Sequence, residues 1–188
     1  MNTRFFTGAG DGGESTVSGK AYGKEDAVFE ALGGMDAVNA FLGSCRTECT
    51  HQSVPALREV GNTILKIQEI VFIAQAEVAA LVFGSSGNTK MILESHVSFL
   101  EETIGTIDKK VPVLTKFIIP GGSELAVRLE LARVEARHAE RAIAGVRERL
   151  KLSPEFLSFW NRLSSVLFAL ARFANHSAGI TETHPSYH

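Results

Sequence analysis

Residues 116–141, KFIIPGGSELAVRLELARVEARHAER, contain the change of pattern that decides the fold. A short apolar run stops at Pro120-Gly-Gly, and Ser123 then provides a good N-cap for a helix with a glutamate in its first turn. Apolar residues recur at helical spacing from Leu125 to Ile143. The stretch therefore predicts a turn followed by a long helix with one apolar face.

A column of arginines lies on this predicted helix. Arg133, Arg137 and Arg141 are four residues apart, which places them one above the other on one face. Like charges at that spacing destabilise a helix by roughly 0.2–0.5 kcal/mol per pair unless an anion lies among them. The column is therefore a candidate anion site. The alternative, which periodicity alone favours slightly, is a solvated stripe neutralised by three neighbouring glutamates, namely Glu130, Glu135 and Glu140.

Length and composition limit the classes of protein to consider. With 188 residues, of which 45% are hydrophobic, the chain can form one domain with one core over residues 1–188. A net charge of −2 gives no general electrostatic reason to bind nucleic acid or an acidic membrane. The N-terminus has no apolar signal core, and the longest apolar run, residues 70–83, is interrupted by polar residues. Since Cys45 and Cys49 do not form a disulfide framework, we expect a soluble, cytoplasmic protein.

The N-terminal residues 4–24, RFFTGAGDGGESTVSGKAYGK, are rich in glycine and hydroxyl side chains, and they predict a glycine-rich loop over residues 1–24. Closely spaced glycines let backbone amides approach phosphate oxygens, while a lysine offsets charge and an aspartate can hold Mg²⁺. The stretch does not match the Walker phosphate-binding pattern. By itself it is therefore either a phosphate-binding loop or a flexible N-terminal arm.

Four more helices follow from apolar periodicity, with no strand pattern between them. In the first, Asp36 is either the cap of a helix that begins after Gly33-Gly34 or a functional residue. Together the helices predict an all-α five-helix bundle over residues 25–175, followed by a disordered tail over residues 176–188. The four predicted helices cover residues 27–45, 54–83, 91–107 and 153–175.

Two groups of residues contain side chains that can bind a metal ion, but neither group has enough of them to form a metal site. A di-iron bundle needs Glu-x-x-His on two helices, and the chain offers this spacing once, from Glu135 to His138. A soft metal would need a fourth ligand beside Cys45, Cys49 and His51, so these are more simply residues at a helix end.

Four motifs, TGAGDGGES, GGMDAVNAFLG, FIIPGGSELAVRLELARVEARHAER and FWNRLSSVLFALAR, together resemble the PduO-type ATP:corrinoid adenosyltransferases in order and spacing. The resemblance covers residues 4–175. It implies an enzyme that transfers the 5′-deoxyadenosyl group of ATP to the cobalt of reduced cobalamin and releases triphosphate. It also implies a homotrimer of five-helix bundles with active sites between subunits.

The resemblance further implies which residues form the site. Arg133 and Asp36 match a pair that forms a salt bridge across the subunit interface, and Phe117 matches the aromatic residue at the lower face of the corrin. Arg133, Arg137, Asp36 and Phe117 are therefore the expected catalytic residues. The expected ATP-binding residues are Thr7, Gly8, Ala9, Gly10, Asp11, Ser15, Thr16, Lys24, Arg137, His138, Glu140, Arg141 and Asn161.

The implied substrates are ATP, with Mg²⁺ bound mainly through its phosphates, and cobalamin. The implied protein partners are a flavoprotein reductase and an adenosylcobalamin-dependent enzyme. The chain departs from the family pattern at Ala37, where a glutamate is usual, at His138, where a second arginine is usual, and at Ser165, where an aspartate is usual. These departures leave a second interpretation open, a non-catalytic corrinoid- and nucleotide-binding carrier of the same fold.

Overall fold

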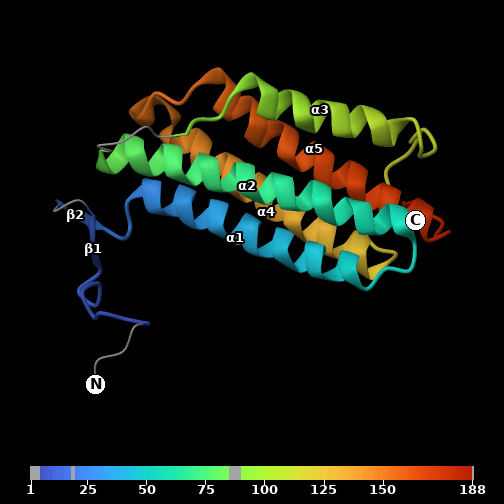
Figure 1. Cartoon of the computed structure of the whole chain (residues 1–188), viewed down its shortest axis with the longest axis horizontal. Coiled ribbons are helices and arrows are strands. Elements are labelled where there is room, and N and C mark those ends of the chain that lie inside the picture. The colour runs from blue at the N-terminus through green and yellow to red at the C-terminus, as the bar shows by residue number, and fades with distance from the viewer. Residues whose placement is uncertain (1–4, 18–19, 85–89, 188) are drawn as a thin grey trace.

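The computed structural model describes residues 5–17, 20–84 and 90–187. Residues 1–4 and 18–19 of the predicted glycine-rich loop lie outside this part. Within it the five-helix bundle predicted from the sequence is confirmed (Figure 1). The helices are α1 (Ala27–Thr50), α2 (Pro55–Phe83), α3 (Glu94–Asp108), α4 (Glu124–Leu150) and α5 (Pro154–Ser177), and two short strands, β1 (Glu14–Val17) and β2 (Lys20–Gly23), precede them.

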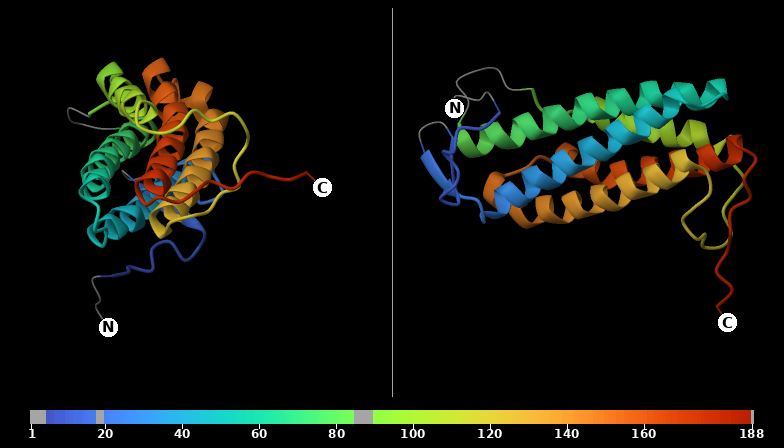
Figure 2. Two further views of the ribbon diagram at one scale, coloured as in Figure 1. Left: turned by 90° about the vertical axis from the view of Figure 1, so that its right-hand side faces the viewer. Right: turned by 90° about the horizontal axis from the view of Figure 1, so that it is seen from below.

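Helix α4 lies at the centre of the packing, because it contacts both α1 and α5. Helix α1 also packs against α2, and α3 packs on α5 (Figures 1 and 2). The apolar face predicted for α4 is buried from Leu125 to Ile143. On α5, Phe156, Phe159 and Trp160 are the largest fully buried side chains. Their burial stabilises the bundle by roughly 1.5–3 kcal/mol per side chain relative to exposure.

The residues that cap α4 and α1 confirm one predicted helix cap and contradict another. The Oγ atom of Ser123 accepts a hydrogen bond from the Ala126 amide at 3.2 Å, so the predicted cap of α4 is confirmed. Helix α1 is instead capped by Asp26, which accepts from the Val28 amide at 2.9 Å. Because α1 starts at Ala27, Gly33-Gly34 lies inside the helix, and the interpretation of Asp36 as a cap is wrong.

Gly34 has a packing role inside α1. A Cβ atom at this position would lie 3.1 Å from the Cα atom of Ala139 on α4. The small residues at both positions therefore allow α1 and α4 to approach closely.

The N-terminal segment contains a structure that the sequence did not predict. Strands β1 and β2 pair antiparallel, with Glu14 opposite Gly23. Tyr22 of β2 makes edge contacts with Phe29 of α1 and Phe83 of α2, at centroid distances of 6.4 and 5.2 Å. The predicted featureless loop is therefore partly a hairpin docked on the end of the bundle.

An ion pair also fixes the start of α1 against the end of α4. Both Asp26 carboxylate oxygens accept hydrogen bonds from the Arg149 guanidinium, at 2.8 and 3.0 Å. The hydrogen bond with Arg149 lowers the pKa of Asp26 below its ordinary value, so the carboxylate is ionised at neutral pH.

Two predicted helix boundaries differ from the structure. Helix α1 extends to Thr50 rather than residue 45, and α3 begins at Glu94 rather than residue 91. Leu81, near the end of α2, is 47% exposed, and Asn161 on α5 is also exposed.

The tail after α5 makes defined contacts where the sequence predicts disorder. The Ile119 amide donates to the Thr183 carbonyl at 2.8 Å, and Arg172 forms an ion pair with Glu182 at 2.9 Å. The tail and the α3–α4 connection lie at the same end of the bundle (Figure 2). The tail therefore lies along the connection that carries Phe117.

Glu77 of α2 is a buried carboxyl group, 2% exposed, that holds the start of the α3 region. Its Oε2 atom accepts a hydrogen bond from the Ile92 amide at 2.7 Å. Burial raises the pKa of Glu77, against the smaller opposing effect of this hydrogen bond. In the folded state the group therefore keeps its proton to a higher pH than it does in the unfolded chain.

This shift predicts a pH-dependent effect of Glu77→Gln. In the wild type, the contribution of Glu77 to the unfolding free energy is fully present below the pKa of the group in the unfolded chain, which is near 4.5. This contribution is lost as the pH rises through the higher pKa of the group in the folded state. Glutamine does not titrate, so the variant should gain stability relative to wild type as the pH rises. Urea unfolding between about pH 4.5 and pH 8 measures this difference. A difference in unfolding free energy that is the same across the range would contradict the assignment.

Candidate functional site

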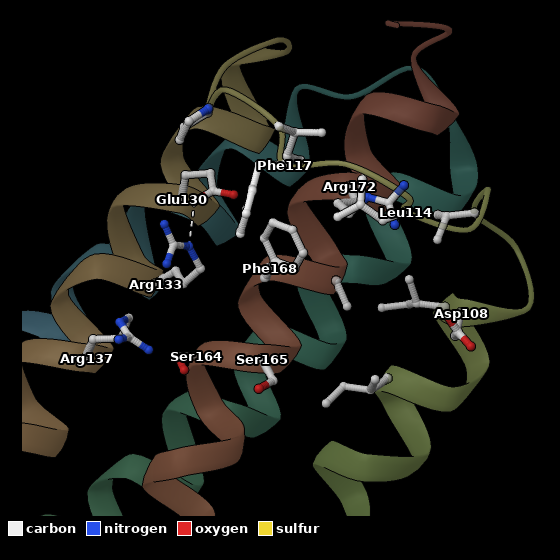
Figure 3. Close-up of a pocket in the computed structure, with 16 residues that line it drawn as sticks. Asp108, Leu114, Phe117, Glu130, Arg133, Arg137, Ser164, Ser165, Phe168 and Arg172 are labelled. Atoms are coloured by element: carbon white, nitrogen blue, oxygen red, sulfur yellow. Dashed lines mark hydrogen bonds and ion pairs between the residues drawn. The ribbon is translucent and has the colours of Figure 1, made fainter. Parts of the chain in front are cut away.

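A cavity of about 570 Å³ opens where α3 ends and α4 begins (Figure 3). Its volume falls within the roughly 300–1,000 Å³ of typical small-molecule sites. The end of α3, the connection that follows it, α4 and α5 each contribute to its wall. The apolar lining residues are Ile104, Ile107, Val111, Leu114, Phe117, Ile118, Pro120, Phe168 and Ala169, and the polar ones are Asp108, Glu130, Arg133, Arg137, Ser164, Ser165 and Arg172.

Three of the four expected catalytic residues lie together in this cavity. Phe117 points into it between α4 and Phe168 of α5, and Arg133 and Arg137 line the α4 side (Figure 3). The Phe117 side chain is 79% exposed, so it is not part of the core. The cavity thus combines an apolar wall with a cationic edge, which suits a ligand that has an apolar part and an anionic group.

The fourth expected catalytic residue lies elsewhere. Asp36 is exposed on α1 and makes no hydrogen bond or ion pair within the described residues. The Arg133 guanidinium donates instead to Glu130, from Nε to Oε2 at 2.6 Å. A single chain therefore does not form the Asp36–Arg133 pair.

The expected nucleotide-binding residues of α4 continue from the cavity along the helix. Arg137, His138 and Arg141 are exposed, and Arg137 has no ion pair among the described residues. The Asn161 side chain donates from Nδ2 to Glu140 Oε1 at 2.8 Å, so α5 brings these two expected residues together. Among the residues that the structure describes, no ion pair therefore neutralises Arg137 or Arg141 of the arginine column.

The expected residues of the N-terminal loop lie together, but away from that column. The Lys24 ammonium donates to the Gly10 carbonyl at 2.7 Å, and the Thr7 hydroxyl accepts from the Ala9 amide at 3.3 Å. Figure 1 places the loop at the end of the bundle opposite the C-terminus. Within the described residues no hydrogen bond or ion pair joins residues 7–16 to α4.

The Asp11 carboxylate also belongs to this loop. A Cβ atom built on Gly8 would lie 3.6 Å from Asp11 Oδ2, so the carboxylate stands beside the backbone of the first turn. Lys24 and Asp11 are the charged residues of this segment that were expected to meet the phosphates of ATP and their metal ion. Ser15 and Thr16 lie on β1, the first strand of the hairpin.

Sequence reasoning missed several residues of the site. Ser164, Phe168 and Arg172 line the cavity, and Asn175 bonds the Pro-Gly-Gly turn. Asn175 is 6% exposed on a helix whose buried face is otherwise almost entirely apolar. The apolar period of α5 places Asn175 on the buried face, and a polar residue at such a position is the sequence signal that could have identified it.

The structure gives no support for a metal site built by the protein. Across residues 5–17, 20–84 and 90–187, no three histidine, cysteine or carboxylate side chains cluster as metal ligands do. Cys45 and Cys49 are buried free thiols, and burial raises their pKa values to about 12 and about 11. Such thiols stay protonated and unreactive near neutral pH. In the same described ranges, no helix is both long and apolar enough to span a bilayer.

The fold and the cavity together define the class of protein: it is a five-helix bundle with an aromatic side chain and two arginines around a cavity at one end. The family model for cobalamin adenosyltransferase matches residues 5–174, and the chain belongs to that family. This confirms the family resemblance inferred from the four sequence motifs.

Individual relatives agree with the family. The corrinoid adenosyltransferase of Bacillus subtilis (strain 168) is 32% identical over 177 residues, covering 94% of this chain and 89% of the relative. The human corrinoid adenosyltransferase MMAB is 30% identical over 191 residues, covering 95% and 72%. The corrinoid adenosyltransferase PduO of Citrobacter freundii is 33% identical over 174 residues, and the match covers 92% of this chain but only 50% of that longer protein.

A solved structure shows the same fold. A variant of the PduO-type ATP:corrinoid adenosyltransferase from Lactobacillus reuteri, complexed with cobalamin and ATP, superposes with a TM-score of 0.87. The two chains are 28% identical, and the match covers 97% of this chain and 99% of the other.

Proposed function

We propose that this protein transfers the 5′-deoxyadenosyl group of ATP to the cobalt of cob(I)alamin, giving adenosylcobalamin and triphosphate. The observation that carries the proposal is the cavity in which Phe117, Arg133 and Arg137 meet. Family membership supports it, because relatives that share the fold are named for this chemistry or are complexed with both substrates.

The reaction needs positioning more than acid–base catalysis. The cobalt of cob(I)alamin attacks C5′ of ATP, a cobalt–carbon bond forms, and the carbon–oxygen bond to the triphosphate breaks with its electron pair leaving on that oxygen. Since the nucleophile is already reactive, the protein has to align it with C5′ and stabilise the negative charge on triphosphate. Arg137, Arg141 and Lys24 supply positive charge for this, and Phe117 occupies the lower face of the corrin. Magnesium enters as the MgATP substrate, with Asp11 near its phosphates.

The active site is proposed to be shared between subunits of a homotrimer. Val127, Leu131 and Val134 form an exposed apolar stripe on α4, with exposed fractions of 38%, 50% and 40%. Their helical spacing continues directly into His138 and Arg141, so a subunit that covered the stripe would also reach these residues. The N-terminal loop, which lies away from α4 of its own chain, would then serve α4 of a neighbour. Asp36 would likewise meet Arg133 across the interface.

The setting is proposed to be a reducing cytoplasm, since both thiols are free. A flavoprotein reductase would supply the electron that forms cob(I)alamin, and an adenosylcobalamin-dependent enzyme would receive the product.

The direct test is formation of adenosylcobalamin from ATP and chemically reduced cobalamin, followed by absorbance under anaerobic conditions. Turnover that depends on both substrates is the expected result, and a folded preparation without turnover would overturn the proposal. The second candidate function, a non-catalytic carrier, is favoured by one observation: His138 stands exposed where the family usually has an arginine. Calorimetric titration separates the two candidates, because a carrier would bind cobalamin or ATP without adenosyl transfer.

A further inference from the structure

The C-terminal end of α5 presents two polar residues to the connection that carries Phe117. Arg172 and Asn175 are three residues apart, so they lie on the same face of the helix. Asn175 is 6% exposed, and the Arg172 side chain is 10% exposed. Buried polar side chains are stable only where they make hydrogen bonds, and the partners of these two lie in the connection and the tail.

Asn175 is bonded to the Pro-Gly-Gly turn on both sides of Gly122. Its Oδ1 atom accepts from the Ser123 amide at 2.9 Å, and its Nδ2 atom donates to the Gly121 carbonyl at 2.9 Å. Gly122 has a φ of 109°, and a Cβ atom there would collide with the Asn175 side chain. The turn therefore needs glycine at this position both for its backbone conformation and for the contact with Asn175.

Arg172 holds the other end of the connection. Its Nη2 atom donates to the Pro112 carbonyl at 3.0 Å, and its Nη2 and Nε atoms donate to the Glu182 carboxylate of the tail, at 2.9 and 3.0 Å. The backbone between Pro112 and Ser123 is thus attached at both ends to one face of α5. Phe117 lies near the middle, where the tail also contacts the backbone: the Phe117 carbonyl lies 2.8 Å from His184 Nδ1, and the Ile119 amide donates to the Thr183 carbonyl. The Phe117 side chain is 79% exposed, so backbone anchoring by α5 and the tail, rather than core packing, sets the position of its ring.

We propose that Asn175, with Arg172 as a second anchor, is a positioning residue for the corrinoid half of the reaction. Asn175 does not line the cavity; it fixes the Pro120-Gly-Gly turn and thereby the place of the Phe117 ring at the cavity wall. This inference rests on the proposed function for its substrate. It predicts that loosening the turn impairs corrinoid use while leaving the nucleotide residues of α4 in place.

The test compares Asn175→Ala, Asn175→Asp and the matched control His176→Ala, an exposed neighbour on the same helix. Steady-state kinetics with each substrate varied in turn should show about a ten-fold rise in KM for cob(I)alamin in Asn175→Ala, with KM for ATP unchanged. Asn175→Asp keeps the acceptor for Ser123 but replaces the donor to Gly121 with a buried carboxylate oxygen that faces a carbonyl oxygen, so a rise at least as large is expected. Equal changes in both KM values, or none, would overturn the proposal.

Hydrogen exchange without any substrate tests the anchoring separately. Amides of residues 113–123 should exchange faster in Asn175→Ala than in wild type or His176→Ala, while amides in α2 keep their rates. Unchanged exchange in the connection would overturn the anchoring role. If wild type formed no adenosylcobalamin, the proposed function and the corrinoid role would fail together, whereas the exchange result would still decide whether Asn175 holds the turn.

Discussion

Replacing Arg137 by alanine is expected to lower kcat/KM for adenosyl transfer by about 100- to 1,000-fold, the usual cost of removing one group that stabilises charge in a transition state. The side chain lines the cavity and has no ion pair among the described residues, so its charge is available to a ligand. The loss should be measured as kcat and KM for both substrates. A fall in kcat would place Arg137 on the departing triphosphate, and a rise in KM for ATP alone would place it on the bound nucleotide.

The control for this variant is Arg147→Ala on the same helix. Arg147 is exposed and does not line the cavity, and within the described part of the chain it pairs only with its neighbour Glu148, at 3.3 Å. Both variants should retain the helical circular dichroism of wild type and an unfolding free energy within about 0.5 kcal/mol of it, because both sites are on the surface. Equal activity of the two variants would remove Arg137 from the proposed mechanism.

Replacing Leu131 by aspartate is expected to convert the proposed trimer to monomers and to lower activity by at least about 100-fold. Leu131 is the middle residue of the exposed apolar stripe on α4, and an unpaired carboxylate buried in an interface costs several kcal/mol. The folded monomer itself should persist, since the side chain is already 50% exposed. Size-exclusion chromatography with light scattering measures the mass, and the adenosylation assay measures the loss of shared sites.

Phe72→Asp provides the matched control for the interface. Phe72 is 64% exposed on α2, so this change also places a carboxylate at an exposed apolar position, but away from α4. It should leave both mass and activity as in wild type. If Leu131→Asp stayed trimeric and Phe72→Asp dissociated, the interface would lie on the α2 side of the bundle instead.

Much of the bundle could be predicted because local signals agreed with one another. The α4 helix had a capping serine, an acidic first turn and an apolar period, and each of these features appears in the structure. The choice of Phe117, Arg133 and Arg137 as expected site residues came from the family resemblance rather than from periodicity, and their meeting in one cavity is a finding of the structure. Residue pattern alone slightly favoured a solvated arginine stripe.

The remaining features depend on contacts between residues far apart in the sequence. The hairpin of β1 and β2 was missed because its strands have four residues each and lie among glycines, and its docking depends on Phe83 at the far end of α2. The ordered tail depends on the Arg172–Glu182 pair and on a hydrogen bond to Ile119. Neither contact leaves a periodic trace in the sequence, so composition alone suggested disorder.

The attachment of the N-terminal segment to its own bundle predicts how two defective forms of the chain would combine. Tyr22, Asp26 and Arg149 tie the base of the segment to its own bundle, while the Thr7–Asp11 turn lies away from its own α4. If that turn serves the next subunit, a lesion in it would impair a neighbour's site and spare the site formed by its own α4. In a cell that makes two forms of the chain, mixed trimers would then let a loop-defective form and an Arg137-defective form complement each other. Each form alone would be inactive.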